Sequence, residues 1–273
     1  MRRGAEVPTG LAPPIHPNTE SIMSIDRAAI FAAVRASPFG GRLTQDQVDG
    51  LEAMLATGGT LPRAHLAYAL ATAFHETGRA MQPVVENLNY TSAARIRAVW
   101  PTRFLSEEAA APFVRNPRAL ANRVYGGRLG NTDPDDGWRY RGRGLVQITG
   151  RDNYARAGRQ LGVDLASDPD LALRPDLAAG ILFAGMAQGW FTGRKLADYF
   201  NDAVNDPVDA RRIVNALDRA ADIAGYHRAF LAALTAAERP GSAGPAVVSA
   251  STPRSPQPAG LWARLRRFFT RNV

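Results

Sequence analysis

Two glutamates, Glu76 and Glu86, lie ten positions apart at and after the end of a strongly apolar stretch. Glu76 continues a pattern in which Leu66, Ala69 and Ala73 recur at three- and four-residue spacing, so its carboxyl lies at the end of a core-facing stripe. Burial and the negative end of the helix dipole both favour a protonated acid there. A protonated carboxyl and a second, ionised one are the minimal apparatus for hydrolysing a glycosidic bond. A solvated last-turn glutamate is the more frequent arrangement for a single residue of this kind.

A glycine-rich segment later in the chain has a pattern typical of a short strand. From Leu145 to Thr149 the side chains alternate, and this predicts that Gln147 and Thr149 face outward together. Glycines at 142 and 144 allow a polymer to approach the backbone closely. The alternative, a glycine-rich turn followed by a core strand, fits the pattern equally well.

Aromatic and amide side chains near this segment and near residue 215 suit sugar binding. Trp138 and Tyr140 offer flat apolar faces with polar edges that stack well on sugar rings. Asn215 places an amide in a helix expected near 207–217, where an apolar residue would continue the core. A hydrogen-bonded core asparagine is the alternative interpretation.

Helices are expected to position most of these groups. Thr60, Pro62 and Gly78 bound the helix that carries Glu76. Thr44 with Gln47 forms a capping box for a helix that ends near residue 56. Further helices are expected near 25–35, 92–99, 106–115, 117–125, 170–190, 194–202, 207–217 and 219–236.

Together these runs resemble the family-19 glycoside hydrolases, and more closely the branch found as phage endolysins than the plant chitinases. The resemblance covers about residues 24 to 234. It rests on Phe74-His75-Glu76-Thr77, Glu86-Asn87-Leu88-Asn89-Tyr90, Tyr140 to Thr149 with Asn153-Tyr154, and Ile213-Val214-Asn215. It implies an α+β, predominantly helical, lysozyme-like fold with two lobes and a small β element beside the cleft. It also implies cleavage with inversion at the anomeric carbon.

Carried over by position, the resemblance makes Glu76 the proton donor. Thr149 matches a hydroxyl that helps to hold the attacking water, and Gln147, Asn153 and Asn215 match sugar-contacting positions. The remaining substrate-binding candidates lie in or beside the same runs: His75, Tyr90, Trp138, Tyr140 and Arg212.

Glu86 as the catalytic base is a hypothesis, because the plant enzymes carry their base farther along the chain in a loop that this sequence lacks. Glu107 and Glu108 remain alternatives, although they read better as first-turn helix carboxylates. Inversion predicts that the two catalytic carboxyl groups lie roughly 6.5 to 9.5 Å apart.

Composition limits the chemistry further. The chain has 273 residues, 45% of them hydrophobic, and no cysteine, which excludes disulfides and thiol catalysis. The four histidines lack zinc-ligand spacing. The acidic run Asn131 to Gly137 resembles a calcium loop, but position twelve would be Gly142 instead of a glutamate. We therefore expect no metal and no cofactor, and a turn-rich loop beside the cleft.

Most of the formal charge of +8 lies near the C-terminus, where six arginines follow Glu238 without an acid. Residues 238–260 are expected to be a flexible linker rich in Pro, Ser and Ala. Residues 261–273 are expected to form a basic amphipathic helix that contacts an anionic membrane surface. Its membrane-contacting residues are Trp262, Arg264, Arg266, Arg267, Phe268 and Phe269. Docking of this helix on the protein's own core is the alternative.

Residues 1–22 contain four prolines and no apolar run of signal-peptide length, and are expected to be a disordered extension. The catalytic domain is then 23–237. The missing signal-peptide run favours synthesis in the host cytoplasm, and a monomer is expected. The resemblance to phage endolysins implies release to the periplasm and cell wall by a holin-type agent. No nucleic-acid partner is expected, because the core lacks a basic stripe.

The sequence therefore predicts a bacteriolytic endolysin that hydrolyses β-1,4 glycosidic bonds of peptidoglycan. The alternatives are a chitinase that cleaves a polymer of β-1,4 N-acetylglucosamine, and a wall-binding module without catalysis.

Overall fold

The structure is a computed structural model that describes residues 26–237. The expectations for 1–22, for the linker at 238–260 and for the helix at 261–273 with its membrane-contacting residues lie outside the described residues. None of the helices in 26–237 has the length and apolar character needed to cross a bilayer.

The larger lobe surrounds α3 (Arg63–Glu76), a helix with nine consecutive buried residues from Leu66 to Phe74. The helices that pack on it are α2 (Gln45–Gly58), α9 (Pro175–Gln188) and α10 (Ala220–Ala236), and α1 (Arg27–Ala36) packs on α10. Phe74 lies at the centre of an aromatic group, with its ring 4.9 Å from Phe39 and 5.9 Å from Phe230. Because every face of α3 is covered, its C-terminal residue Glu76 is held by a rigid element.

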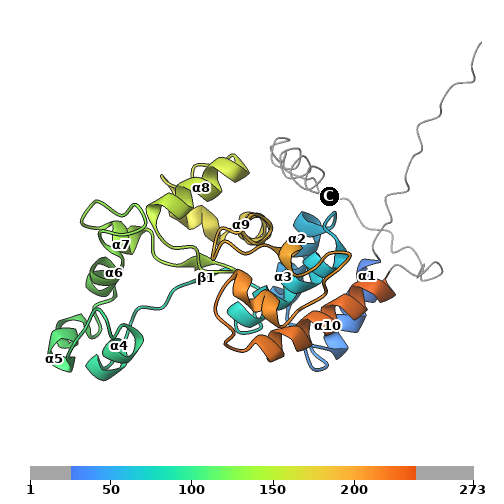
Figure 1. Ribbon diagram of the computed structural model, residues 1–273, viewed down its shortest axis with the longest axis horizontal. Coiled ribbons are helices and arrows are strands. Elements are labelled where there is room, and N and C mark those ends of the chain that lie inside the picture. The colour runs from blue at the N-terminus through green and yellow to red at the C-terminus, as the bar shows by residue number, and fades with distance from the viewer. Residues whose placement is uncertain (1–25, 238–273) are drawn as a thin grey trace, which may run out of the picture.

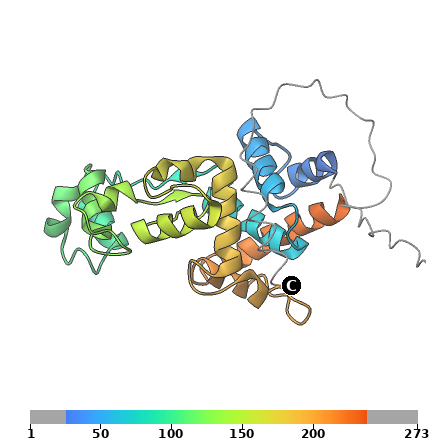
Figure 2. The ribbon, with the colours of Figure 1, turned by 90° about the horizontal axis from the view of Figure 1, so that it is seen from above.

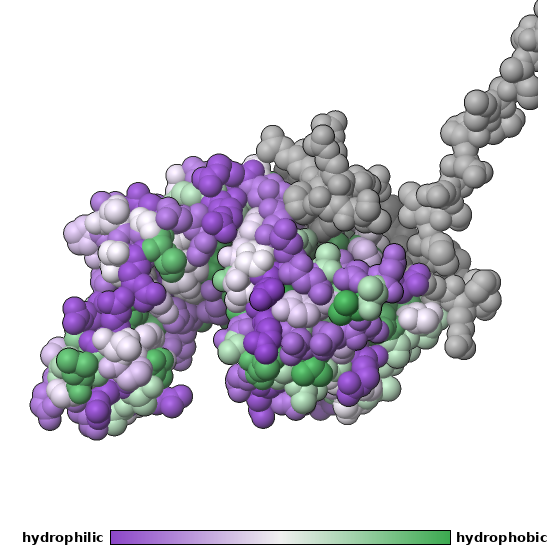
Figure 3. All heavy atoms as spheres, in the orientation of Figure 1, coloured by the Kyte–Doolittle hydropathy of each residue, from purple (hydrophilic) through white to green (hydrophobic). Residues whose placement is uncertain are grey.

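The smaller lobe has a separate core. Its helices are α4 (Ala93–Val99), α5 (Glu107–Ala110), α6 (Pro117–Tyr125) and α7 (Asp136–Arg139), with a 3-10 turn at Ala111–Phe113. Leu88, Ile96, Phe104, Leu120 and Val124 are among the buried residues of this core. Figure 1 shows α4 to α7 grouped apart from α1, α2, α3 and α10, and Figure 2 shows the same separation from above. The space-filling surface is notched between the two lobes (Figure 3).

A two-stranded antiparallel sheet lies between the lobes. Val84 of β1 (Val84–Val85) pairs with Gly144 of β2 (Arg143–Gly144), and Val85 pairs with Arg143. The strand expected at 145–149 is wrong, because the chain turns after Gly144 and returns through a bridge between Arg143 and Ile148. Gln147 has a positive φ of 54° within this turn. Val146 and Ile148 are buried and Gln147 and Thr149 are half-buried, as the expected alternation requires, whereas Leu145 is buried instead of facing outward.

Helix α8 (Arg151–Leu161) follows this turn and packs on α9. The helices expected at 170–190, 194–202 and 207–217 are shorter. A 3-10 turn at Pro169–Leu173 precedes α9, and the other two are 3-10 turns at Leu196–Asp198 and Asp209–Ile213. The predominantly helical α+β class with a small β element and two lobes is confirmed by the arrangement of residues 26–237.

Candidate active site

Glu76 is the last residue of α3 (Arg63–Glu76), where Pro62 takes the N-cap position instead of the expected Thr60. The predicted stop at Gly78 is confirmed by its φ of 59°. The Oε1 of Glu76 accepts a hydrogen bond from Nη1 of Arg211 at 2.5 Å. The side chain of Arg211 is 3% exposed and that of Glu76 is 24% exposed. Glu76 therefore lies at the edge of the core in an ion pair.

This ion pair corrects the expectation that Glu76 has a purely apolar setting. Arg211 comes from the 3-10 turn at Asp209–Ile213, 135 positions along the chain, and its Nε also donates to the carbonyl of Asp218 at 3.1 Å. The guanidinium is thus fixed on two sides and orients the carboxylate. The arginine predicted to bind substrate was the neighbouring Arg212. Its exposed side chain approaches only Asp209, with Nε 3.5 Å from the carboxylate.

Glu86 follows β1 and has a different environment. Its Oε1 accepts a hydrogen bond from the hydroxyl of Tyr125 at 2.6 Å, and its Oε2 accepts one from the N–H of Gly142 at 3.1 Å. The N–H of Glu86 donates to the carbonyl of Gly142 at 2.9 Å. Both carboxylate oxygens therefore have neutral donors, and these two hydrogen bonds fix the orientation of the carboxylate.

The two tyrosines beside Glu86 stay protonated. Burial raises the pKa of Tyr125, and the negative charge of Glu86 raises it further. Burial and then Glu86 also raise the pKa of Tyr90. The ring of Tyr90 packs edge-on against Trp100 at 5.3 Å, at the margin of the smaller core. Tyr125 was not among the predicted site residues, because no motif marks it.

Gly142 is required for this arrangement. A Cβ at residue 142 would lie 2.6 Å from Oε1 of Gln147 and 3.1 Å from the Cβ of Glu86. The glycine thus admits the side chains of the site itself, rather than a polymer. Gln147 is held in turn, because its Nε2 donates to the carbonyl of Val84 at 2.9 Å.

Thr149 and Asn153 form a local hydrogen-bonded unit. The hydroxyl of Thr149 donates to the carbonyl of Gln147 at 3.3 Å, and Nδ2 of Asn153 donates to the carbonyl of Thr149 at 2.8 Å. Both side chains are half-buried. Their roles in holding water and sugar stay predictions.

Tyr140 and Trp138 differ from their expected roles. Tyr140 is 3% exposed and its hydroxyl donates to the carbonyl of Ala166 at 2.9 Å, so the expectation that it stacks on a sugar is corrected. One face of Trp138 is covered, because the guanidinium carbon of Arg141 lies 3.7 Å from the centre of its ring.

Asn215 lies after the 3-10 turn at Asp209–Ile213 and is exposed, since the expected longer helix is absent; the core-asparagine interpretation is wrong. His75 is half-buried and lines a small pocket of about 210 Å³ with Phe74, Arg79 and Tyr226. That pocket adjoins the end of α3 next to Glu76.

The loop at 131–137 is cross-linked by Arg151. The carboxylate of Asp136 accepts the N–H groups of Thr132 and Asp133, and Nη2 of Arg151 lies 2.9 Å from Asp136 and 2.6 Å from Asp133. The guanidinium thus takes the place that a cation would have in such a loop. Across residues 26–237 no group of three His, Cys, Asp or Glu side chains is arranged to hold a metal ion.

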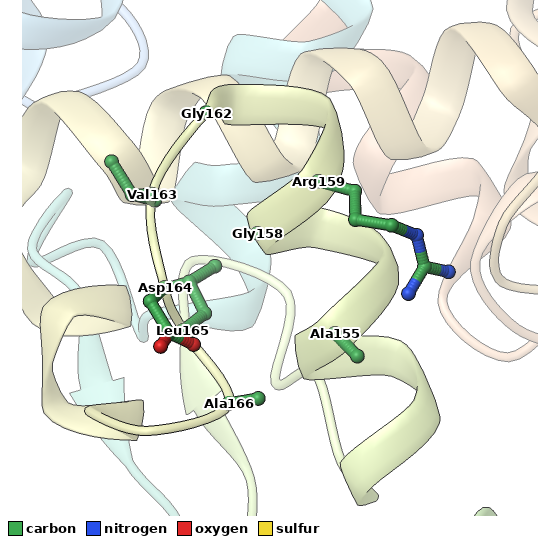
Figure 4. Close-up of a pocket in the computed structure, with 8 residues that line it drawn as sticks. All are labelled: Ala155, Gly158, Arg159, Gly162, Val163, Asp164, Leu165 and Ala166. Atoms are coloured by element: carbon green, nitrogen blue, oxygen red, sulfur yellow. The ribbon is translucent and has the colours of Figure 1, made fainter.

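Glu107 and Glu108 occupy the first turn of α5, as expected, with Ser106 as the N-cap. Hydrogen bonds from backbone N–H and from Ser106 lower the pKa of the exposed Glu108. A larger pocket of about 410 Å³ lies between α8 and residues 162–166 (Figure 4). None of the predicted site residues lines it.

Comparisons with known proteins find similarity over parts of the chain. Residues 113–197 match the family described as chitinase class I. The chain is 39% identical over 130 residues to a glycosyl hydrolase family 19 domain-containing protein of Haemophilus influenzae, which covers 47% of this chain and 64% of that protein. The chain thus spans less than two thirds of this relative's length.

Two solved structures are similar over most of the described residues. Chitinase C from Streptomyces griseus is 20% identical, with a TM-score of 0.44 over 78% of this chain and 77% of that chain. A bacterial family 19 chitinase is 22% identical, with a TM-score of 0.42 over 78% of this chain and 95% of that chain. Residues 113–197 and the 130 residues matched by the Haemophilus influenzae relative are thus the parts of the chain that are similar to glycosyl hydrolase family 19.

Proposed function

We propose that this protein hydrolyses β-1,4 glycosidic bonds of peptidoglycan by an inverting mechanism. The observation that carries the proposal is the contrast between the two carboxylates. Glu76 is held by one guanidinium at the edge of the larger core, whereas Glu86 is held by two neutral donors after β1. Two acidic groups that are held by different partners can take different roles in one reaction, and this supports the proposal.

In this mechanism Glu76 protonates the bridging oxygen and Glu86 deprotonates a water on the opposite face of the sugar ring. The entering polymer must separate the carboxyl of Glu76 from Arg211 before Glu76 can carry a proton to the leaving group. Thr149 helps to hold the water. The spacing of the two carboxyl groups remains a prediction of roughly 6.5 to 9.5 Å.

The test is hydrolysis of purified peptidoglycan by the full chain and by the variants Glu76→Gln and Glu86→Gln. Each variant is expected to lose at least about a hundredfold in turnover, the usual contribution of a general acid or base. Glu107→Gln is the matched control, because this glutamate lies in the first turn of α5. NMR of the newly formed reducing end should show inverted configuration. Near-normal turnover by Glu76→Gln, or retained configuration, contradicts the mechanism.

A chitinase is the second candidate, because the matched family is described as chitinase class I. It would use the same carboxylates on a neutral polymer of N-acetylglucosamine. Ratios of kcat/KM on peptidoglycan and on chitooligosaccharides separate the two substrates. A wall-binding module without catalysis would bind peptidoglycan and release no reducing ends.

We infer further that the protein is a bacteriolytic endolysin released to the cell wall by a holin-type agent, with the basic C-terminal segment directing it to an anionic membrane surface. The charge pattern after Glu238 supports this proposal. Truncation at Ala259 is expected to reduce killing of intact Gram-negative cells and to leave hydrolysis of purified peptidoglycan unchanged. Equal killing by both forms contradicts the role of the segment.

A further inference from the structure

Two arginines of the glycine-rich segment differ sharply in how their charge is satisfied. Arg143 is 4% exposed and forms an ion pair with Asp170 at 2.8 Å. Its guanidinium also donates to the carbonyls of Arg139 and Arg141, at 2.8 and 3.2 Å. Arg143 therefore has an internal structural role.

Arg141 has no such partner. Its guanidinium carbon lies over the indole of Trp138, 3.7 Å from the ring centre, and Nη1 donates to the carbonyl of Trp138 at 2.9 Å. In the part of the chain that the structure describes, Arg141 forms no ion pair. Since a guanidinium has five N–H donors, most of its hydrogen-bonding capacity remains unused.

The charge of Arg141 is also held partly away from water. Burial lowers the pKa of Arg141, and the like charge of Arg143 lowers it further. Arg141 is half-buried, lies over an aromatic ring and has no carboxylate in an ion pair with it. Such an arginine is suited to bind an anion from outside the protein.

This guanidinium is close enough to the proposed base for the negative charge of Glu86 to act on it. The next residue, Gly142, donates its N–H to Oε2 of Glu86 at 3.1 Å. The positive charges of Arg95 and Arg128 act on Tyr90 and Tyr125, the two phenols next to Glu86. An anionic group that reaches this side of the site therefore meets the positive charges of these arginines as well as the negative charge of Glu86.

We propose that Arg141, stacked on Trp138, is a specificity-determining residue that binds a carboxylate of the polymer and thereby selects an anionic amino-sugar polymer over neutral chitin. The inference rests on the proposed function. The planar guanidinium matches a carboxylate with two parallel hydrogen bonds, which a compact ammonium does not reproduce.

Peptidoglycan offers carboxylates from two sources. Peptide stems carry free carboxylates in the intact wall, and the ether-linked acid of the sugar becomes free only after the peptides have been removed. Intact peptidoglycan and amidase-treated, peptide-free glycan therefore test the two sources separately, and a neutral chitooligosaccharide serves as the reference substrate.

The variants are Arg141→Gln, Arg141→Lys and the matched control Arg156→Gln, which removes an exposed arginine of α8. For Arg141→Gln, the ratio of kcat/KM on intact peptidoglycan to kcat/KM on the chitooligosaccharide is expected to fall roughly ten- to hundredfold, the range for a lost hydrogen bond to a charged group. Arg141→Lys should recover only part of the ratio, and Arg156→Gln should leave it unchanged.

A fall confined to intact peptidoglycan assigns the carboxylate to the peptide stem, and a fall on peptide-free glycan assigns it to the sugar acid. Circular dichroism checks that Arg141→Gln remains folded. Binding to insoluble peptidoglycan in a Glu76→Gln background should weaken by a similar factor, with reduced dependence on salt. Equal losses on all three substrates, or an unchanged ratio, overturn the inference. If Glu76→Gln leaves the activity of the otherwise unchanged chain intact, the proposed function fails independently of Arg141.

Discussion

The ion pair between Arg211 and Glu76 gives a quantitative test of the site. The perturbation is a double-mutant cycle of Glu76→Gln, Arg211→Met and both together. Nη1 of Arg211 and Oε1 of Glu76 lie 2.5 Å apart, and the side chain of Arg211 is 3% exposed. Removing one partner of a buried pair costs about 3–5 kcal/mol when the other charge is left without compensation.

The structure predicts unequal costs for the two single changes. Glutamine retains an oxygen that accepts from Arg211, and Arg211 keeps its hydrogen bond to the carbonyl of Asp218, so Glu76→Gln should cost about 1–2 kcal/mol. Arg211→Met leaves a carboxylate that is 24% exposed and becomes hydrated, which reduces the cost to about 2–4 kcal/mol. The coupling free energy should be about 1–3 kcal/mol.

Urea unfolding at pH 7 measures the free energy of unfolding of each protein in the cycle. In thermal unfolding, each kcal/mol of lost stability should lower the Tm by about 2–4 °C for a domain of this size. The pair of the exposed Arg174 and the half-buried Asp176 is the control, and removing Arg174 should cost less than about 1 kcal/mol. A coupling free energy below about 0.5 kcal/mol would refute the ion pair in solution.

Three further predictions concern residues around the site and in the core. Tyr125→Phe removes the hydroxyl donor to Glu86 and should lower kcat about tenfold with little change in stability; an unchanged kcat would show that the base does not need this donor. Gly142→Ala places a Cβ 2.6 Å from Oε1 of Gln147 and should cost about 1–3 kcal/mol in urea unfolding, whereas full stability would mean that the turn relaxes freely. Burial lowers the pKa of His227 from 6.5 to about 4, so the unfolded chain takes up a proton first and stability is lost as the pH falls from 6.5 towards 4. That loss should reach about 3 kcal/mol and should be absent in His227→Phe; parallel pH profiles of the two proteins contradict this assignment.

Local patterns were enough to predict most helices. The capping box of Thr44 and Gln47 and the helix at Pro117–Tyr125 are confirmed, because short-range hydrogen bonds and proline geometry decide them. The strand predicted at 145–149 is wrong because the chain turns back tightly there, with a positive φ at Gln147. The turn also buries Leu145, which a strand would have placed facing outward.

The partners within the site could not be predicted in the same way. Arg211 reaches Glu76 across 135 positions and Tyr125 reaches Glu86 across 39, and neither contact leaves a periodic signal in the sequence. The arginine pair at 211 and 212 did mark the correct turn. Only the packing of that turn against the end of α3 shows which arginine faces inward.

The two lobes divide the proposed chemistry between them. Glu76 terminates a helix of the larger core, whereas Glu86 is tethered through Tyr125 to α6 of the smaller one. The proposed acid and the proposed base are thus attached to two separate cores. In the proposed mechanism, a rotation of one lobe against the other would change the gap in which the attacking water must fit.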